Sequence, residues 1–161
     1  MGNVVSIIRG VTFPASAKGT VREPGTVACL RTASVQAEID WDDMIYIPES
    51  GVKRADQWVE IGDLVISMAN SYELVGKLAY VDRVPQRATF GGFIAVIRPY
   101  SIDAKYVLTV LRSPEMQAAF RGSSSQTTNI ANISLAGMRP MPFPVPPLAE
   151  QHRIVAKVDE L

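Results

Sequence analysis

The feature that most constrains this chain is a proline-dense segment near its C-terminal end, RPMPFPVPP at residues 139–147. Five of these nine residues are proline, which lacks a backbone N–H and has a restricted φ. Such a segment cannot lie inside a helix or a central strand, so we expect it to be extended and stiff. It separates a body at residues 1–140 from a terminal segment at 148–161, with residues 141–147 as a strap between them.

The terminal segment, LAEQHRIVAKVDEL, has the spacing of an amphipathic helix. Ile154, Val158 and Leu161 recur at intervals of four and three, and Leu148 and Gln151 lead onto the same side. A lone surface helix does not need such an apolar stripe, which is typical of a helix that pairs with another. We expect these five residues to serve helix pairing, with the helix continuing in a longer native chain. The alternative is that the stripe packs on its own domain.

Before the strap, the period of the apolar residues changes from that of strands to that of helices. Short β-branched and apolar runs bounded by Gly and Pro predict strands at 4–9, 27–31, 44–48, 64–68, 74–81 and 93–98. Helical spacing follows at 106–111, with Ser101 or Asp103 as the cap, and a second helix begins at Ser113 and ends at Gly122. The pattern predicts an α+β fold, with a polar loop (RGSSSQTTNIAN) at residues 121–132.

Composition is that of one globular domain. The chain has 161 residues, 47% hydrophobic and 20% charged, which is enough to bury a core. The apolar runs are too short to cross a bilayer, and the first residues lack a secretory signal. The single cysteine, Cys29, cannot form an internal disulfide, which fits a reducing cytoplasm.

The formal net charge is zero, which does not by itself indicate a nucleic-acid binder. The charge is unevenly distributed, with +3 in residues 1–37, −6 in 38–63, +4 in 64–139 and −1 in 140–161. Folding could place the two basic blocks on one face. The alternative is that these charges only solvate the surface, and on charge alone we prefer it.

Motifs of the common catalytic centres are missing. No GxxxxGK[ST] phosphate loop, no GxGxxG after a strand and no aminomethyltransferase motif is present. One cysteine and one histidine cannot make a Cys/His metal site. The acidic residues at 38–43 could bind a hard cation, and Cys29 with His152 could form a nucleophile–base pair. We interpret the acidic residues as a solvated turn and strand edge and Cys29 as a residue of the core. The sequence therefore predicts no catalytic centre, no cofactor and no metal.

The segment FPVPPLAEQHRIVAKVDEL at 143–161 resembles the end of a target-recognition domain in the specificity subunit of type I restriction–modification enzymes. In that family a Pro-x-Pro-Pro strap opens a long spacer helix, and the matching residues here are Pro144, Pro146, Pro147, Leu148, Glu150, Gln151, Arg153, Ile154 and Val155. Weaker similarities follow the family's order at 7–13, 62–68, 75–81, 90–99, 106–117 and 126–134.

The resemblance implies a recognition domain with a curved, twisted β-sheet and a few helices, followed by the start of a long coiled-coil spacer helix. It implies reading of one half of a bipartite site in double-stranded DNA, in the cytoplasm of a bacterium or archaeon. Methyl transfer from S-adenosylmethionine would belong to a modification (methyltransferase) subunit that docks to this one, and cleavage to a motor-nuclease subunit. The family's full subunit has two such domains and two helices, so this chain matches one domain and the first turns of one helix.

Two other function classes stay open. One is an assembly module that has lost DNA binding and acts through helix-mediated self-association. The other is an unrecognised enzyme that uses the acidic residues at 38–43 or the Cys29–His152 pair.

Polar side chains at the expected turns are the candidates for DNA contact. Gln126 and Asn129 can make bidentate pairs to adenine, and arginines can take guanine edges or phosphates. The full candidate set is Arg31, Thr32, Ser34, Gln36, Asn70, Ser71, Tyr72, Arg87, Thr89, Arg121, Gln126, Thr127, Thr128 and Asn129. The alternative for the loop at 121–132 is that its side chains satisfy the loop's own backbone.

Overall fold

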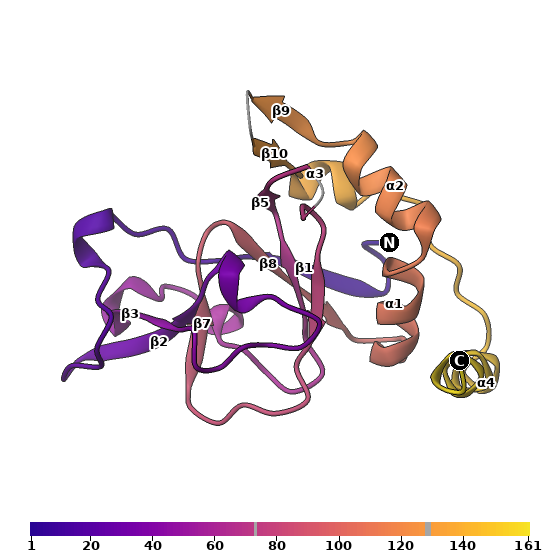
Figure 1. The fold of residues 1–161 in the computed structure, drawn as a ribbon. Coiled ribbons are helices and arrows are strands. Elements are labelled where there is room, and N and C mark those ends of the chain that lie inside the picture. Colours follow the sequence, from indigo (N-terminus) through magenta and orange to yellow (C-terminus); the bar gives the residue numbers. More distant parts are fainter. Residues whose placement is uncertain (73, 128–129) are drawn as a thin grey trace.

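The computed structural model describes residues 1–72, 74–127 and 130–161, and its fold is drawn in Figure 1. The mixed α+β class expected from the sequence is confirmed. The strands are β1 (Val5–Arg9), β2 (Thr26–Leu30), β3 (Ile45–Pro48), β4 (Leu64–Ser67), β5 (Ala69–Asn70), β6 (Leu78–Tyr80), β7 (Ala88–Phe90), β8 (Ile94–Pro99), β9 (Ser125–Thr127) and β10 (Ile130–Asn132). The helices are α1 (Ala104–Leu111), α2 (Pro114–Gly122), α3 (Leu135–Met138) and α4 (Leu148–Asp159), with short 3-10 helices at Ala15–Ala17, Thr32–Ser34, Glu49–Gly51 and Ala55–Gln57.

The main sheet is antiparallel, with strand order β1-β8-β4-β6. Its central strand β4 is buried along its whole length, because both faces of the sheet are covered. Leu64 and Ile66 point into one cluster of buried residues, and Val65 points into another. Burial on both faces explains why this strand has a continuous apolar run and no polar alternation.

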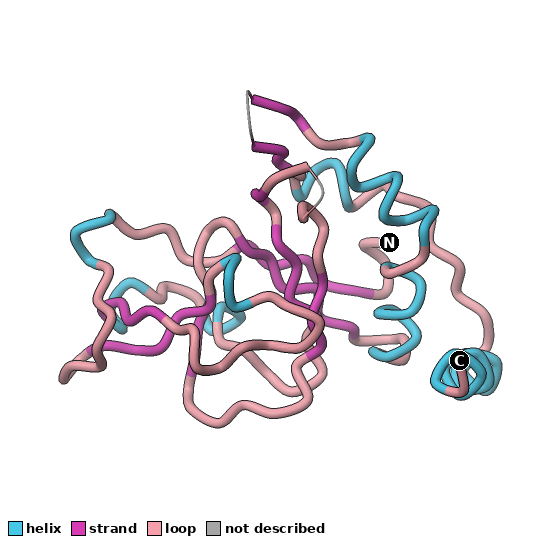
Figure 2. Tube along the Cα trace, viewed as in Figure 1, coloured by secondary structure: helices cyan, strands magenta, loops and turns pink. Residues whose placement is uncertain are grey.

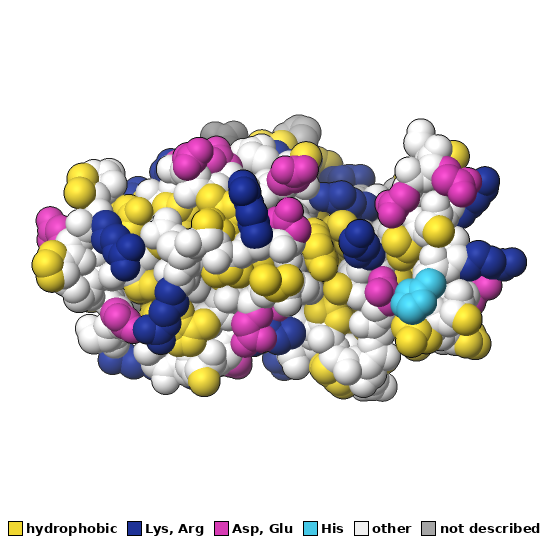
Figure 3. All heavy atoms as spheres, turned by 90° about the horizontal axis from the view of Figure 1, so that it is seen from below, with side chains coloured by type: hydrophobic (Ala, Val, Ile, Leu, Met, Phe, Trp, Pro, Cys, Tyr) yellow, Lys and Arg dark blue, Asp and Glu magenta, His cyan; other side chains and the backbone are white. Residues whose placement is uncertain are grey.

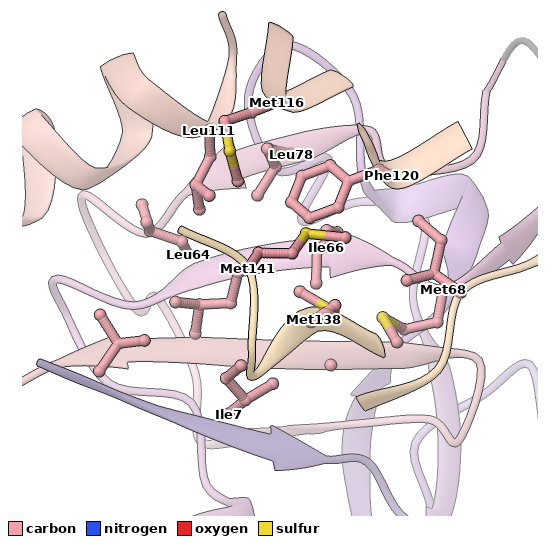
Figure 4. Close-up of a cluster of buried hydrophobic side chains, with 14 of the residues drawn as sticks. Ile7, Leu64, Ile66, Met68, Leu78, Leu111, Met116, Phe120, Met138 and Met141 are labelled. Carbon is pink, nitrogen blue, oxygen red and sulfur yellow. The ribbon is translucent and has the colours of Figure 1, made fainter. Parts of the chain in front are cut away.

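Helices cover one face of the main sheet. In Figure 4, Leu111, Met116 and Phe120 from α1 and α2 surround Ile66 and Leu78 of the sheet. The other face packs against the second sheet, order β3-β2-β7, in which β2 and β7 are parallel. The result is three layers, helices, main sheet and second sheet, as seen across Figure 1.

The family resemblance implied a curved, twisted β-sheet, and in the described residues the strands form three small sheets. The third, order β5-β10-β9, lies within segments expected to be turns and polar loop. The strand expected at 74–81 begins only at Leu78, because Gly76 has φ +83° and turns the chain before it. Short strands that pair with distant partners have little periodicity of their own, which is why the pattern missed them.

Helix starts agree with the sequence analysis. Asp103 caps α1, its Oδ1 accepting a hydrogen bond from the Tyr106 N–H at 2.8 Å. Ser113 caps α2 with Pro114 at the first helical position, and α2 ends at Gly122 as predicted. These features are local, and local chemistry was enough to predict them.

The strap runs without helix or strand to α4, as Figure 2 shows. Met141 is buried in the core, and Tyr106 holds the strap through its hydroxyl, which donates to the Pro144 carbonyl at 3.3 Å. Helix α4 lies against α1, and no coiled coil is evident among the described residues. The expected coiled-coil part of the fold is therefore not seen. No helix in the described ranges is long and apolar enough to span a membrane.

Candidate nucleic-acid interface

The third sheet brings together two of the segments expected to contact DNA. Asn70 of β5 pairs with Ala131 of β10, and β10 pairs in turn with β9. The strand residues at 69–70 and at 125–127 and 130–132, more than 50 positions apart in the sequence, therefore lie side by side at one end of the main sheet (Figure 1). The sequence pattern could not predict this contact, because it depends on long-range strand pairing.

Candidates at 70–72 differ in how free their side chains are. Asn70 is half-buried, and its Oδ1 accepts a hydrogen bond from the Ser71 N–H at 2.9 Å. Its Nδ2 donates to the Ser67 Oγ at 3.4 Å. Tyr72 is 45% exposed and offers both a ring and a hydroxyl to a partner. Of these residues, Tyr72 is the most available for contact.

Four candidates of the polar loop fall partly or wholly outside the structure. The side chains of Gln126 and Thr127 and the whole of Thr128 and Asn129 lie outside the described residues. Arg121, at the last turn of α2 that leads into β9, is half-buried.

The candidates at 31–36 are largely tied to the protein itself. Ser34 has no exposed surface, and its hydroxyl donates to the Asp43 carbonyl at 2.6 Å. Arg31 makes an ion pair with the Asp43 carboxylate. Gln36 is exposed, but its amide donates to the Ala33 carbonyl at 2.8 Å and accepts from the Lys77 ammonium. Thr32 is half-buried.

Thr89 and Arg87 lie on the second sheet, away from the third. Thr89 is fully buried, and its hydroxyl donates to the Gln57 carbonyl at 2.7 Å. Arg87 is exposed, pairs with Glu49 and lies over the Trp58 ring, 3.6 Å from its centroid. A DNA contact by Ser34 or Thr89 would require the local structure to open, since neither has surface to offer.

The acidic residues at 38–43 form a turn. Asp40 Oδ1 accepts hydrogen bonds from the backbone N–H groups of Asp42 and Asp43, at 3.0 and 3.2 Å. Among the described residues, no group of three or more His, Cys, Asp or Glu side chains is placed to hold a metal. On the face shown in Figure 3, acidic and basic side chains are interspersed.

Cys29 and His152 are on separate elements. Cys29 is buried in β2, where burial raises the pKa of its thiol to about 12. His152 is in α4, with its Nε2 3.8 Å from an Asp103 carboxylate oxygen. A neutral, enclosed thiol is a packing residue and not a nucleophile.

The helix-pairing candidates take two different positions on α4. Leu148, Val158 and Leu161 are exposed, and Ile154 is half-buried. Gln151, in contrast, is 3% exposed and faces the strap and the N-terminal cap of α1. Val155, which the sequence analysis did not count among the helix-pairing residues, joins Val158 in a groove against Leu108 of α1.

Three arginines that the sequence analysis did not select lie along β1. Arg9, Arg54 and Arg139 come from β1, the segment before the 3-10 helix at Ala55–Gln57, and the residue after α3. All three are exposed and line one hollow of about 420 Å³. The only signal for Arg9 in the sequence is its outward position at the end of a strand pattern.

Comparisons with known proteins point to one family. A family model described as the type I restriction modification DNA specificity domain matches residues 1–161. The chain is 29% identical over 163 residues to the type I restriction enzyme EcoKI specificity subunit of Escherichia coli (strain K12). It is 30% identical over 164 residues to the StySPI specificity subunit of Salmonella potsdam. Each alignment covers 100% of this chain but 35% of the relative, so the chain spans about a third of these relatives' length.

A solved structure shares the fold. The crystal structure of the HsdS subunit from Thermoanaerobacter tengcongensis matches with a TM-score of 0.68 at 23% identity. The match covers 99% of this chain and 35% of that one. The fold of the described residues, with three small sheets and four α-helices, is therefore shared with a segment of that HsdS subunit.

Proposed function

The chain belongs to the family of type I restriction modification DNA specificity domains, and from this premise we propose that it reads one half of a bipartite target in double-stranded DNA. As a specificity domain it is a non-catalytic component of a type I restriction enzyme. The chain spans 35% of the length of its curated relatives, and we propose that the second half of the target is read by a second recognition domain.

The observation that carries the proposal is the family match over all 161 residues. The geometry supports it, because the third sheet gathers polar side chains from two distant segments at one place. A reader of DNA sequence needs such side chains to reach base edges, while phosphate contacts hold it in register.

We assign base reading first to the candidates in or next to the third sheet, which are Asn70, Ser71, Tyr72, Gln126 and Thr127, with Arg121 at the end of the helix that leads into β9. Thr128 and Asn129 lie outside the described residues, and they stay in this group because of their place in the polar loop of the sequence. The second group, away from that sheet, is Arg31, Thr32, Gln36 and Arg87. Ser34 and Thr89 are left out, because both are fully buried and bonded to backbone carbonyls.

The partners follow from the family. We propose that the domain docks to a methyltransferase subunit, which holds S-adenosylmethionine, and through it to a motor-nuclease subunit, in the cytoplasm. The exposed Leu148, Val158 and Leu161 on α4 are proposed to pair with a second helix of a longer chain. Self-association through the same helix is the alternative.

Selection of bound sequences from randomised duplexes tests the proposal, with the methyltransferase subunit present to add clamping contacts. The parent protein should enrich one short motif. Asn70→Ala should change the preferred bases, at roughly 1–3 kcal/mol for a lost bidentate pair to adenine. Tyr72→Ala should also change them, through loss of its ring and hydroxyl contacts. Asn3→Ala, which removes an exposed amide before β1, is the matched control and should select the parent motif.

Three outcomes count against the proposal in different ways. If the parent enriches no motif, DNA reading by this domain is wrong and the assembly-module alternative gains. If every third-sheet variant returns the parent motif, those residues are scaffold and the reading surface lies elsewhere. If Asn3→Ala changes the motif as much as Asn70→Ala does, the effect is not local to the third sheet.

A further inference from the structure

Two hollows meet at the edge strand β1. The first, of about 410 Å³, is lined by residues of β10 and β5, by Phe93 and by Arg9. The second, of about 420 Å³, runs along β1 past Arg54 and Arg139. Arg9 and Leu135 line both hollows, so the two hollows adjoin at these residues, and we treat them as one trough. We call it the β1 trough and define it by Arg9, Arg54, Phe93, Asn132, Leu135 and Arg139.

The β1 trough carries a net positive charge in a chain whose net charge is zero. Its lining contains three arginines and, among the residues that the structure describes, Asp56 as the only carboxylate. Asp56 is paired with Arg54, Nε to Oδ1 at 3.0 Å. The charge of Arg9 and Arg139 therefore has no acidic counterpart in the lining.

Arg9 and Arg139 are free to bind a ligand. Both are exposed, and neither guanidinium makes a hydrogen bond or ion pair with any residue in the described ranges. Each is nevertheless held by its backbone. The Arg9 carbonyl accepts from Arg54 at 3.3 Å and from Gln57 at 3.2 Å, and the Arg139 carbonyl accepts from the Gly2 N–H at 3.4 Å.

The trough begins at the proposed reading surface. Asn132, which lines its first hollow, pairs with Ala69 of β5, next to Asn70. A DNA strand whose bases face the third sheet would thus continue along β1. Phe93, 70% exposed at the first hollow, adds apolar surface there for a sugar or base.

We propose that the β1 trough binds the phosphate backbone of the DNA whose bases the third sheet reads, with Arg9 and Arg139 as the phosphate contacts and Arg54 as a supporting cation. A guanidinium presents donors in a fork that fits phosphate oxygens, and a line of such contacts sets the register of a reader on its duplex. This inference rests on the proposed function. It also explains how a domain of zero net charge could bind DNA, because the positive charge of the trough acts on the phosphates near it.

The test is a salt titration of duplex binding by the full chain, measured by fluorescence anisotropy. Arg9→Gln and Arg139→Gln should each weaken binding to all sequences alike, by about ten-fold, as loss of a charge-assisted hydrogen bond predicts. Each should also lower the slope of log K against log salt by about 0.9, and the double variant by about twice that. The motif selected from randomised duplexes should stay the same.

Arg83→Gln is the matched control. Arg83 is an exposed arginine that follows β6, the edge strand on the other side of the main sheet from β1. The last residue of β6, Tyr80, pairs with Leu64, whereas Arg9 pairs with Ala95 at the other end of the strands. Arg83 therefore lies away from the β1 trough. Its affinity and salt slope should match those of the parent. Equal melting temperatures for all variants show that the changes act on binding and not on folding.

Failure of this inference can be told from failure of the proposed function. If the parent selects a motif but the double variant keeps the parent's affinity and slope, the trough does not bind phosphate and only this inference falls. The same holds if Arg83→Gln lowers the slope equally, since the effect is then one of net charge. If the parent binds no duplex at all, both fall, and capture of an acidic peptide by the trough would show what replaces DNA.

Discussion

The side-chain oxygen of Gln151 in α4 accepts a hydrogen bond from the backbone N–H of Asp103, the capping residue of α1, at 2.9 Å. The same side chain donates through Nε2 to the Pro146 carbonyl at 2.7 Å. One buried amide thus joins the strap, the start of α4 and the start of α1. The direction in which α4 leaves the domain is set at this point.

Gln151→Leu should destabilise the domain by about 1–2 kcal/mol, because it leaves the partly buried N–H of Asp103 and carbonyl of Pro146 without partners. Chemical denaturation measures the change. His152→Ala alters the exposed neighbour on the same helix and should cost less than about 0.5 kcal/mol. A Gln151→Leu protein as stable as the parent would mean that α4 is held by other contacts.

Thr89→Val should lower the free energy of unfolding by about 1–2 kcal/mol and leave the selected DNA motif unchanged. The valine keeps the volume of the buried side chain but cannot donate to the Gln57 carbonyl. Thr20→Val, at an exposed threonine, is the control and should have little effect on stability. A changed motif in Thr89→Val would return this residue to the base-reading set.

Cys29 should react with a thiol reagent only after unfolding. Burial raises the pKa of its thiol to about 12, so the folded protein holds almost no thiolate at neutral or mildly alkaline pH. In the unfolded chain the thiol has its ordinary pKa of 9.0, so it loses its proton when the pH exceeds that value. The thiol's contribution to stability is therefore present at lower pH and falls as pH rises through the alkaline range towards 12.

Absorbance of the released reagent product, with and without denaturant, checks the reactivity. Cys29→Ala checks the linkage, because its stability should fall less steeply with alkaline pH than that of the parent. Rapid modification of the native protein at neutral pH would contradict the buried position.

Leu148→Gln and Val158→Gln should leave this domain folded, with stability changes below about 1 kcal/mol, because about half of each side chain is exposed. If α4 pairs with a second helix in a longer chain, as we propose, the same changes should weaken that pairing, as sedimentation velocity can measure. Lys157→Gln on the same helix is the control. If either change unfolds the domain, α4 is part of the core and not a pairing element.

The candidate residues for DNA contact show which positions a rule based on residue type and turn position selects. Polar type and position at a turn singled out Tyr72 and Asn70, and the structure places both beside the third sheet. The same rule also selected Ser34 and Thr89, which are buried, because a short hydroxyl can satisfy a backbone carbonyl as well as it can reach a base. Arg9 and Arg139 were missed, because neither stands in a polar loop.

The sequence by itself determined the local elements of this protein. Prolines at 139–147 excluded regular structure there, Asp103 and Ser113 set the starts of two helices, and the residues at 143–161 pointed to the family. These features depend on neighbours within a few positions, which a pattern records. Only the tertiary structure decided which strands pair and that β5 and β10 join two distant segments. It also decided that the Gln151 side chain is buried and that Arg9, Arg54 and Arg139 line one hollow. Those outcomes depend on long-range strand pairing and packing, and the spacing of apolar residues says which face is buried but not against what.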